Sequence, residues 1–519
     1  MDLIEREPAT AAPPPRATAL SHREIMTTLY GLLLGMLLAA LDQNIVTTAV
    51  PAIANDLGGF EHLSWIFAGY LLTSTASTPI YGKISDLYGR GPILIISIAL
   101  FVASSAFCAL AQDMGQLVAA RALQGLGGGG MMSVTQALIA DIISPRERGR
   151  YQAYFTGVWA SASVAGPMLG GFFVEYLSWR WVFWINLPVG ALALILCTRA
   201  FRKLPKPRLA RRDIDYWGAV LLTLSVTALL LVSTWGGSIF PWLSTEVLSM
   251  LAVGFVLMSL FLLQEFRALD PILPMRLFGN PIFNLANAVS FIIAISMFGG
   301  IVLMPVQIQL VLDISPGSTG LIMIPLMSGT VIGSFIAGRI MRRTGRYKAI
   351  PPVGIAAAAI AFAALATLDP GTSSVLVMIY LGVLGLGIGP TFPVMMIAIQ
   401  NTCEARDIGV ATSWVFFARS LGASFGAALL WSGLLASLSG RLEQEGHGAL
   451  GTALVHGGPI AAQQMSEADR LLIQPALTHA FHFVFLIAAG IAAVSLVVTL
   501  FLKEERLKSQ IPAQRAEGH

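Results

Sequence analysis

Residues 82–90 read Gly-Lys-Ile-Ser-Asp-Leu-Tyr-Gly-Arg, and residues 338–346 read Gly-Arg-Ile-Met-Arg-Arg-Thr-Gly-Arg. The two stretches share a first glycine, a second glycine seven residues later and an arginine directly after it. Each lies between the second and third apolar segments of a run of six. The repetition therefore predicts two parallel six-helix halves, a plan that places a binding site between the halves at mid-membrane.

Apolar segments long enough to cross a lipid bilayer recur along the chain. Of the 519 residues, 55% are hydrophobic and only 12% are charged, whereas about a quarter of the residues in soluble domains are charged. A bilayer core of about 30 Å needs about twenty helical residues. Hydropathy thus predicts an all-α polytopic membrane protein with fourteen spans, at 26–50, 62–82, 92–111, 115–139, 151–176, 181–201, 215–236, 245–265, 282–311, 316–338, 349–367, 374–400, 408–436 and 478–502.

The order of the spans predicts the domain organisation. Two six-helix bundles are expected, with a two-helix insert and its linkers between them and a tail at each end, at 26–201, 282–502, 202–281, 1–25 and 503–519. Lysine and arginine concentrate in alternate loops, including the run from Arg199 to Arg212, while the opposite loops carry mainly aspartate and glutamate. This positive-inside pattern predicts cytoplasmic termini and an even number of spans. The first 24 residues lack the pattern of a cleaved signal peptide.

Five stretches of the N-terminal half resemble the motifs of one family. They read Leu-Asp-Gln-Asn-Ile-Val-Thr-Thr-Ala-Val-Pro at 41–51, the quoted 82–90, Arg-Ala-Leu-Gln-Gly at 121–125, Gly-Pro-Met-Leu-Gly-Gly at 166–171 and Trp-Arg-Trp-Val-Phe-Trp-Ile-Asn-Leu-Pro-Val-Gly at 179–190. The chain resembles the fourteen-span drug:proton antiporters of the major facilitator superfamily, EmrB/QacA type, although Asn44 stands where threonine is more usual.

The resemblance implies a transporter of the bacterial plasma (inner) membrane that works by alternating access. Its substrates would be small amphipathic or cationic compounds, exported in exchange for protons. A major-facilitator transporter of a specific metabolite or lipid has the same fold and stays an alternative.

Asp42 is predicted to couple transport to protons. It lies about two-thirds of the way along the first span between apolar residues. An ionised carboxylate near the membrane centre costs at least about 2.5 kcal/mol, so Asp42 should face the bundle interior. Arg121 is the candidate partner, because its permanently charged fork can hold a carboxylate. The alternatives are an Asp42 that only packs helices and an Arg121 that is purely structural.

Gly82, Asp86, Gly89 and Arg90 are predicted to form a conformational latch in a short cytoplasmic link. The glycines permit a tight turn, and Asp86 can meet helix N-terminal amides or arginines. Such contacts form only when the two halves close on the cytoplasmic side. The second half has Arg342 at the position of Asp86, so the latch would be asymmetric. An ordinary capped turn is the alternative.

Gly166, Pro167, Gly170 and Gly171 predict a bent and tightly packed fifth span. Pro167 removes a backbone donor in mid-helix, and the glycines allow a neighbouring helix to approach closely. Such a seal suits a protein that must not leak protons. The alternative is glycine-rich packing without meaning for transport.

Aromatic and polar residues inside the spans are predicted to line a substrate cavity. Aromatic faces bind cations, and methionine side chains adapt to many shapes. The candidates are Asn44, Gln124, Trp159, Phe298, Phe392, Trp414, Phe417 and Arg419, with Trp65, Tyr70, Met297, Met395 and Met396 as further apolar residues. Each of them alone fits lipid-facing or core packing as well.

The sequence contains neither a Walker-type phosphate loop nor a His-Glu-x-x-His zinc motif. We therefore expect no enzyme and no cofactor, with the proton gradient as the source of energy. His447 and His456 are too far apart for a convincing metal site, and no metal is expected. The expected partners are small molecules, protons and the lipid bilayer, but no nucleic acid. The chain is expected to act as a monomer, with accessory export proteins as an open option.

Overall fold

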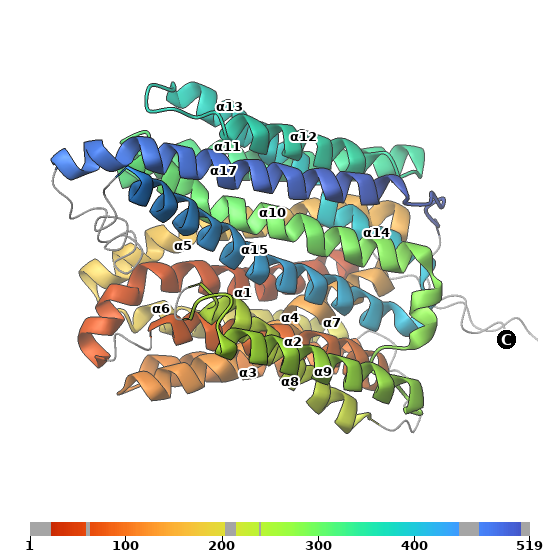
Figure 1. The fold of residues 1–519 in the computed structure, drawn as a ribbon. Coiled ribbons are helices and arrows are strands. Elements are labelled where there is room, and N and C mark those ends of the chain that lie inside the picture. Colours follow the sequence, from red (N-terminus) through yellow and green to blue (C-terminus); the bar gives the residue numbers. More distant parts are fainter. Residues whose placement is uncertain (1–21, 59–62, 203–213, 238–239, 446–466, 510–519) are drawn as a thin grey trace, which may run out of the picture.

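The structure, a computed structural model, describes residues 22–58, 63–202, 214–237, 240–445 and 467–509. In this part of the chain the protein is helical, apart from an isolated bridge between Gly236 and Phe240. The long helices run side by side (Figure 1). Most of the two predicted tails, the basic run up to Arg212, and His447 and His456 lie outside the described residues.

The helices of the N-terminal part follow one another with short connections. They are α1 (His22–Leu57), α2 (Leu63–Tyr88), α3 (Arg90–Leu110), α4 (Met114–Ile142), α5 (Pro145–Tyr176), α6 (Trp181–Trp184), α7 (Asn186–Phe201), α8 (Tyr216–Trp235) and α9 (Thr245–Arg267). Their starts carry local signals. Asp113 caps α4 by accepting a hydrogen bond from the Gln116 amide at 2.8 Å, and Pro145 occupies the first turn of α5, where its missing N–H has no helical partner.

The C-terminal part begins with a short 3₁₀ turn, η2 (Met275–Gly279), and continues as a second set of long helices. These are α10 (Pro281–Leu310), α11 (Pro316–Thr344), α12 (Ile350–Leu365), α13 (Ser374–Ile388), α14 (Thr391–Thr402), α15 (Ile408–Gln444) and α17 (Glu467–Leu500), with the 3₁₀ turn η3 (Ala405–Asp407) before α15.

Many of these helices suit a bilayer. In the described ranges, eleven segments are long and apolar enough to cross a membrane, and α6 with α7 and α13 with α14 each count as one such segment. Three further helices, α2, α4 and α12, have 26, 29 and 16 residues. The chain is therefore an integral membrane protein, while the count of fourteen spans stays a prediction.

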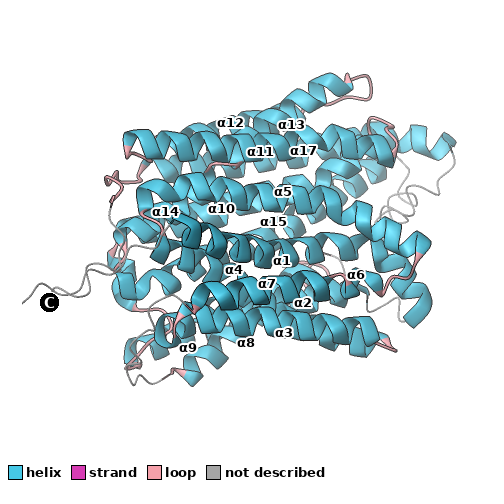
Figure 2. Cartoon of the chain, turned by 180° about the vertical axis from the view of Figure 1, so that it is seen from behind, coloured by secondary structure: helices cyan, strands magenta, loops and turns pink. Residues whose placement is uncertain are grey.

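The two sets of helices form two bodies that meet along a shared boundary. In Figure 1, α1 to α9 fill the lower part and α10 to α17 the upper part, with α5 and α15 near the boundary. Contacts agree, because α5 packs against α11 and α15 packs against α2 and α4. The helices of the predicted insert, α8 and α9, pack against each other, and α8 also contacts α2 and α15. Figure 2 shows the molecule from behind, with α8 and α9 at its lower edge.

A run of four glycines, 127–130, brings α4 close to its neighbours. A Cβ atom on Gly127 would lie 2.7 Å from the Phe101 amide nitrogen of α3, and one on Gly129 would lie 2.5 Å from the Ser77 hydroxyl of α2. The run thus serves close helix packing, and this packing fixes the position of α4, which carries Arg121.

Candidate functional site

Asp42 lies in a closed polar cluster inside the N-terminal body. Its side chain is fully buried, like those of its partners. The Arg121 Nη1 atom donates to one carboxylate oxygen at 2.5 Å, and the side-chain amides of Gln124 and Asn186 each donate to the other at 2.9 Å. The Asp42 side chain therefore accepts hydrogen bonds from three donors, one of which is charged, and such charge-assisted bonds are stronger than neutral ones.

The arginine of this cluster is enclosed as completely as the aspartate. Arg121 also donates to the Ile66 carbonyl at 3.2 Å and to the Gln124 side chain at 2.7 Å. Its guanidinium carbon lies 4.5 Å from the centre of the Tyr70 ring and 5.9 Å from that of Phe183. Two residues predicted for the substrate cavity, Gln124 and Tyr70, belong to this cluster instead, because their faces of α4 and α2 point toward Asp42.

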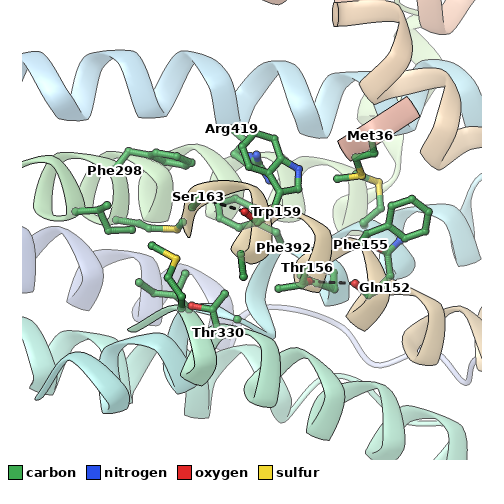
Figure 3. Close-up of a pocket in the computed structure, with 18 of the residues that line it drawn as sticks. Met36, Gln152, Phe155, Thr156, Trp159, Ser163, Phe298, Thr330, Phe392 and Arg419 are labelled. Carbon is green, nitrogen blue, oxygen red and sulfur yellow. Dashed lines mark hydrogen bonds between the residues drawn. The ribbon is translucent and has the colours of Figure 1, made fainter. Parts of the chain in front are cut away.

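A separate cavity lies between the two bodies. Its volume is about 470 Å³, and residues of α1, α4 and α5 line one side while residues of α10, α11, α13, α14 and α15 line the other. Along α5, residues at three- and four-residue spacing turn one helix face to the cavity (Figure 3). Of the predicted residues, those that line the cavity are Asn44, Trp159, Phe298, Phe392 and Arg419, with Met297 and Met396.

Trp414 and Phe417, also predicted for the cavity, do not line it. Side chains one residue apart on a helix point about 100° apart, and on α15 the cavity face carries Val415, Phe416 and Arg419. Trp414 stacks on Phe261 of α9 with a centroid distance of 6.4 Å. The remaining candidates, Trp65 and Met395, also lie outside the lining; Trp65 makes an edge contact with Trp235 of α8.

Arg419 projects into the cavity among aromatic rings (Figure 3). Its guanidinium carbon lies 5.0 Å from the ring centre of Phe392, 5.5 Å from Phe416, 5.8 Å from Phe298 and 5.9 Å from Trp159. In the described ranges Arg419 makes neither an ion pair nor a hydrogen bond to the protein. The guanidinium of Arg419 therefore contacts aromatic rings rather than a carboxylate.

One end of the boundary between the bodies is closed through Asp86. Its carboxylate accepts hydrogen bonds from the backbone amides of Gly409 at 3.1 Å and Val410 at 3.0 Å, at the N-terminus of α15. Arg90 donates to the same carboxylate at 2.9 Å and pairs with Asp141 at 2.8 Å. The contacts anticipated for Asp86 are present, and its role as a latch stays a prediction.

The position of the latch residues differs from the prediction in one respect. Gly82 and Asp86 lie in the last turns of α2, and Arg90 begins α3, so the link itself is the single residue Gly89 with a φ of 93°. Gly82 serves close approach rather than a turn, since a Cβ atom there would lie 2.7 Å from the Gly409 carbonyl oxygen of α15.

A second contact closes the same end between α5 and α11. A Cβ atom on Gly149 would lie 2.7 Å from the Cα atom of Gly338, the first glycine of the second repeat. Nearby, fully buried Arg148 donates to the Gln400 side chain of α14 at 3.2 Å. Arg148 was missed because the fifth span was predicted to begin at 151, although the Ser-Pro pair before it marks the true start of α5.

The glycine motif of α5 packs against α1. A Cβ atom added to Gly166 would lie 2.6 Å from the Cβ atom of Asn44. One added to Gly170 would lie 2.6 Å from the carbonyl oxygen of Ile45. At Gly171 nothing lies within 4 Å, so this glycine does not contribute to close packing, contrary to the prediction. Pro167 lies inside a helix that continues to Tyr176.

One short sequence pattern is typical of hydrolases, but it does not lie in the local structure that hydrolases need for it. Residues 422–426 read Gly-Ala-Ser-Phe-Gly, the spacing of a nucleophile elbow, which needs a sharp turn between strand and helix. Here the pattern lies inside α15, where Ser424 is 2.6 Å from the Ser233 hydroxyl. Both glycines pack against α10.

The chain is similar in sequence and in fold to known membrane transporters. A sequence profile described as Major Facilitator Superfamily matches residues 32–427. An uncharacterised MFS-type transporter of Mycobacterium tuberculosis is 37% identical over 481 residues, which cover 91% of this chain and 69% of that protein. The multidrug transporter protein MdtP of Bacillus subtilis is 34% identical over 520 residues, which cover 94% of this chain and 95% of that protein. The human organic anion transporter MFSD10 superposes with a TM-score of 0.63 at 15% identity, over 92% of this chain and 100% of that one, a likeness of fold alone.

Proposed function

We propose that this chain, which belongs to the major facilitator superfamily, exports small amphipathic compounds in exchange for protons by alternating access. Membership in the family makes it a membrane transporter of small molecules and not an enzyme. Export is favoured over uptake of a metabolite because a relative that matches nearly the whole chain is named a multidrug transporter.

The observation that carries the proposal is the buried pair of Asp42 and Arg121. Breaking a buried ion pair costs about 3–5 kcal/mol when one charge is left uncompensated. Asp42 can avoid that cost by binding a proton when Arg121 moves away, whereas an arginine cannot lose its charge. A change of helix packing that separates the two would therefore be tied to proton uptake at Asp42.

The cavity and the closed end supply the other parts of an alternating-access cycle. The cavity lies between the bodies, where a relative motion of the halves would expose it first to one side and then to the other. The contacts of Asp86 with α15 and of Gly149 with Gly338 join the bodies at one end of their boundary. Their breakage and reformation would open and close that end.

Several finer features belong to the proposal. We infer fourteen spans of the EmrB/QacA type, because α2, α4 and α12 accompany the eleven apolar segments of the described chain. The lysine- and arginine-rich loops support cytoplasmic termini in a bacterial inner membrane. The chain would act as a monomer driven by the proton gradient, without a cofactor, and accessory export proteins stay an open option.

The test replaces Asp42 by asparagine, which keeps the shape of the side chain but cannot titrate. In everted vesicles with an acidic lumen, Asp42→Asn should abolish uphill uptake of an amphipathic fluorescent substrate, while the purified variant should still bind it. Asp113→Asn, at an exposed carboxylate that only caps α4, is the matched control and should transport normally. Unimpaired uphill uptake by Asp42→Asn would refute the coupling role.

A further inference from the structure

The cavity between the bodies carries a positive charge. Among the described residues that line it, Arg419 is the single charged side chain, and no aspartate or glutamate is present. Asp42 directly precedes the cavity residue Gln43, but its carboxylate faces the opposite way and is neutralised by Arg121. The charge of Arg419 is therefore not balanced by this neighbouring carboxylate.

The remaining polar groups of the cavity are largely occupied by the protein itself. The hydroxyls of Thr156, Ser163 and Thr330 donate to carbonyls of their own helices. The side chains of Gln136 and Gln152 are bonded to each other. The side-chain amides of Gln43 and Asn44 donate to the Tyr70 hydroxyl and the Ala40 carbonyl. Within the described lining, Arg419 and Trp159 have side-chain donors but make no side-chain hydrogen bond to the protein, and the indole nitrogen of Trp159 is buried.

The aromatic rings around Arg419 change which ligands the cavity can take. Ring faces attract cations, but here the guanidinium of Arg419 already lies beside four of them. A cationic ligand would meet an occupied aromatic site and a like charge between largely apolar walls, where charges interact more strongly than in bulk water. An anion would instead find an unpaired guanidinium with up to five N–H donors in a planar fork.

We propose that Arg419 binds the anionic head group, a carboxylate or sulfonate, of aromatic amphiphilic substrates whose rings lie against Trp159, Phe298 and Phe392. The inference rests on the proposed export function and narrows its substrate class. The cavity of about 470 Å³ is within the usual range of small-molecule sites. Of the two classes expected from the sequence, the amphipathic one is retained and the cationic one is replaced by an anionic one.

An anionic lipid also presents an anionic head group, so the test must distinguish a lipid ligand from an aromatic one. The lining favours a flat aromatic body, because Trp159, Phe298 and Phe392 border the cavity together with methionines. Planar rings pack against such walls in stacked or edge-on geometry. Competition with phosphatidylglycerol distinguishes the two sources.

The experiment measures binding of three naphthalene probes to the purified full-length chain in neutral detergent by equilibrium dialysis. Naphthalene-2-sulfonate is an anion, 2-naphthylmethanol is neutral and 2-naphthylmethyl-trimethylammonium is a cation, and none of them titrates near pH 7. We expect the sulfonate to bind at least tenfold more tightly than the cation. Equal binding of the two charged probes, or no binding of the sulfonate, would overturn the proposal.

Variants at Arg419 assign the effect to this residue. Arg419→Gln should weaken sulfonate binding at least tenfold and leave binding of the neutral probe within about twofold. Arg419→Lys, which keeps the charge without the fork, should be intermediate. Arg441→Gln is the control, because Arg441 lies on the same helix outside the cavity and pairs with Glu445. A parallel loss of sulfonate and neutral probe in Arg419→Gln would give Arg419 a structural role and contradict the proposal.

Two further arms complete the test. Displacement of bound sulfonate by phosphatidylglycerol in mixed micelles would assign the site to lipid and overturn the aromatic ligand. Export is then measured in everted vesicles. If the wild-type chain binds the sulfonate selectively but shows no proton-driven uptake, the export function fails and the anion site stands. If a neutral amphiphile is transported equally by the wild-type chain and Arg419→Gln without any preference for anions, export stands and the anion site fails.

Discussion

At the scale of single residues, two neighbouring glycines of α5 lie in opposite environments. A Cβ atom on Gly170 would be 2.6 Å from the Ile45 carbonyl oxygen of α1, a backbone atom that cannot give way without moving the helix, whereas one on Gly171 would meet nothing within 4 Å. Overpacking of this kind costs about 1–3 kcal/mol, and alanine in a helix is favoured over glycine by about 1 kcal/mol.

We therefore expect opposite effects of the same substitution at these two positions. Gly170→Ala should lower the unfolding temperature in detergent, and Gly171→Ala should leave it unchanged or raise it slightly. The measurement is the thermal unfolding midpoint of the purified variants. Equal destabilisation by both would contradict the close packing of α5 on α1.

Charged residues of the site were easier to predict than their uncharged partners. Asp42 and Arg121 stand out in the sequence because a charge inside an apolar span needs a partner. Gln124 was assigned to the cavity and Asn186 was not singled out at all, although both bind Asp42. An amide has no comparable cost in a span, so the sequence carries no signal for the face that it occupies.

At the scale of helices, the sequence located most elements but not their faces or ends. Several spans predicted by hydropathy correspond to helices that extend further, as α2 does beyond 82 to Tyr88. Hydropathy reports the apolar middle of a helix, and its polar ends continue past the apolar stretch. This is why Asp86 was placed in a loop and Arg148 was left outside the fifth span.

The contact between α2 and α15 should bias the opening of one end of the molecule. Asp86 accepts from two amides at the start of α15, and a carboxylate at a helix N-terminus contributes about 0.3–2 kcal/mol. Because the two helices belong to different bodies, that energy is present only when this end is closed. Asp86→Ala should shift the equilibrium toward the open form.

The measurement is maleimide labelling of a cysteine introduced at Gln400, which is buried at the closed end. Labelling should rise several-fold in Asp86→Ala, while substrate binding in detergent should change little. Asp113→Ala removes a comparable cap within one body and should not change labelling. Collapsed binding with unchanged labelling would place Asp86 in the fold or the substrate site instead.

The native cysteines leave a low background for this measurement. Cys108 and Cys197 are buried. Burial raises the pKa of the Cys403 thiol to about 12, and the thiolate is the form that reacts. The chain without the introduced cysteine should therefore be labelled weakly at pH 7, and removal of the three cysteines is needed only if it is not.

At the scale of the whole molecule, the internal repeat predicted two halves, but it did not predict which surfaces join them. The first glycine of each copy lies at the boundary, Gly82 against α15 and Gly338 against α5. Each of these two glycines therefore contacts a helix of the opposite body. The asymmetry appears in the charge, because Asp86 caps a helix of the opposite body while the backbone carbonyl of Arg342 accepts from Arg146.

The proposed proton at Asp42 and the proposed anion at Arg419 together set the charge moved in one cycle. A monovalent anion that leaves and a proton that enters both carry positive charge inward, so one exchange moves two elementary charges. Each charge moved through 100 mV contributes about 2.3 kcal/mol, and two contribute about 4.6 kcal/mol. Since about 1.4 kcal/mol corresponds to a factor of ten, a one-for-one exchange should build an anion gradient of about three orders of magnitude per 100 mV.

This dependence can be measured in proteoliposomes whose membrane potential is set with potassium and valinomycin at equal pH on both sides. We expect the steady-state gradient of naphthalene-2-sulfonate to change with potential at about twice the logarithmic slope that a single moving charge gives, because Asp42 and Arg419 lie in separate clusters and can be occupied in separate steps. Liposomes without protein measure the passive leak of naphthalene-2-sulfonate across the lipid. A slope of one charge would mean that the anion crosses without a proton. A gradient that does not depend on the potential would mean that the anion crosses together with a cation in the same direction, which would contradict exchange for a proton.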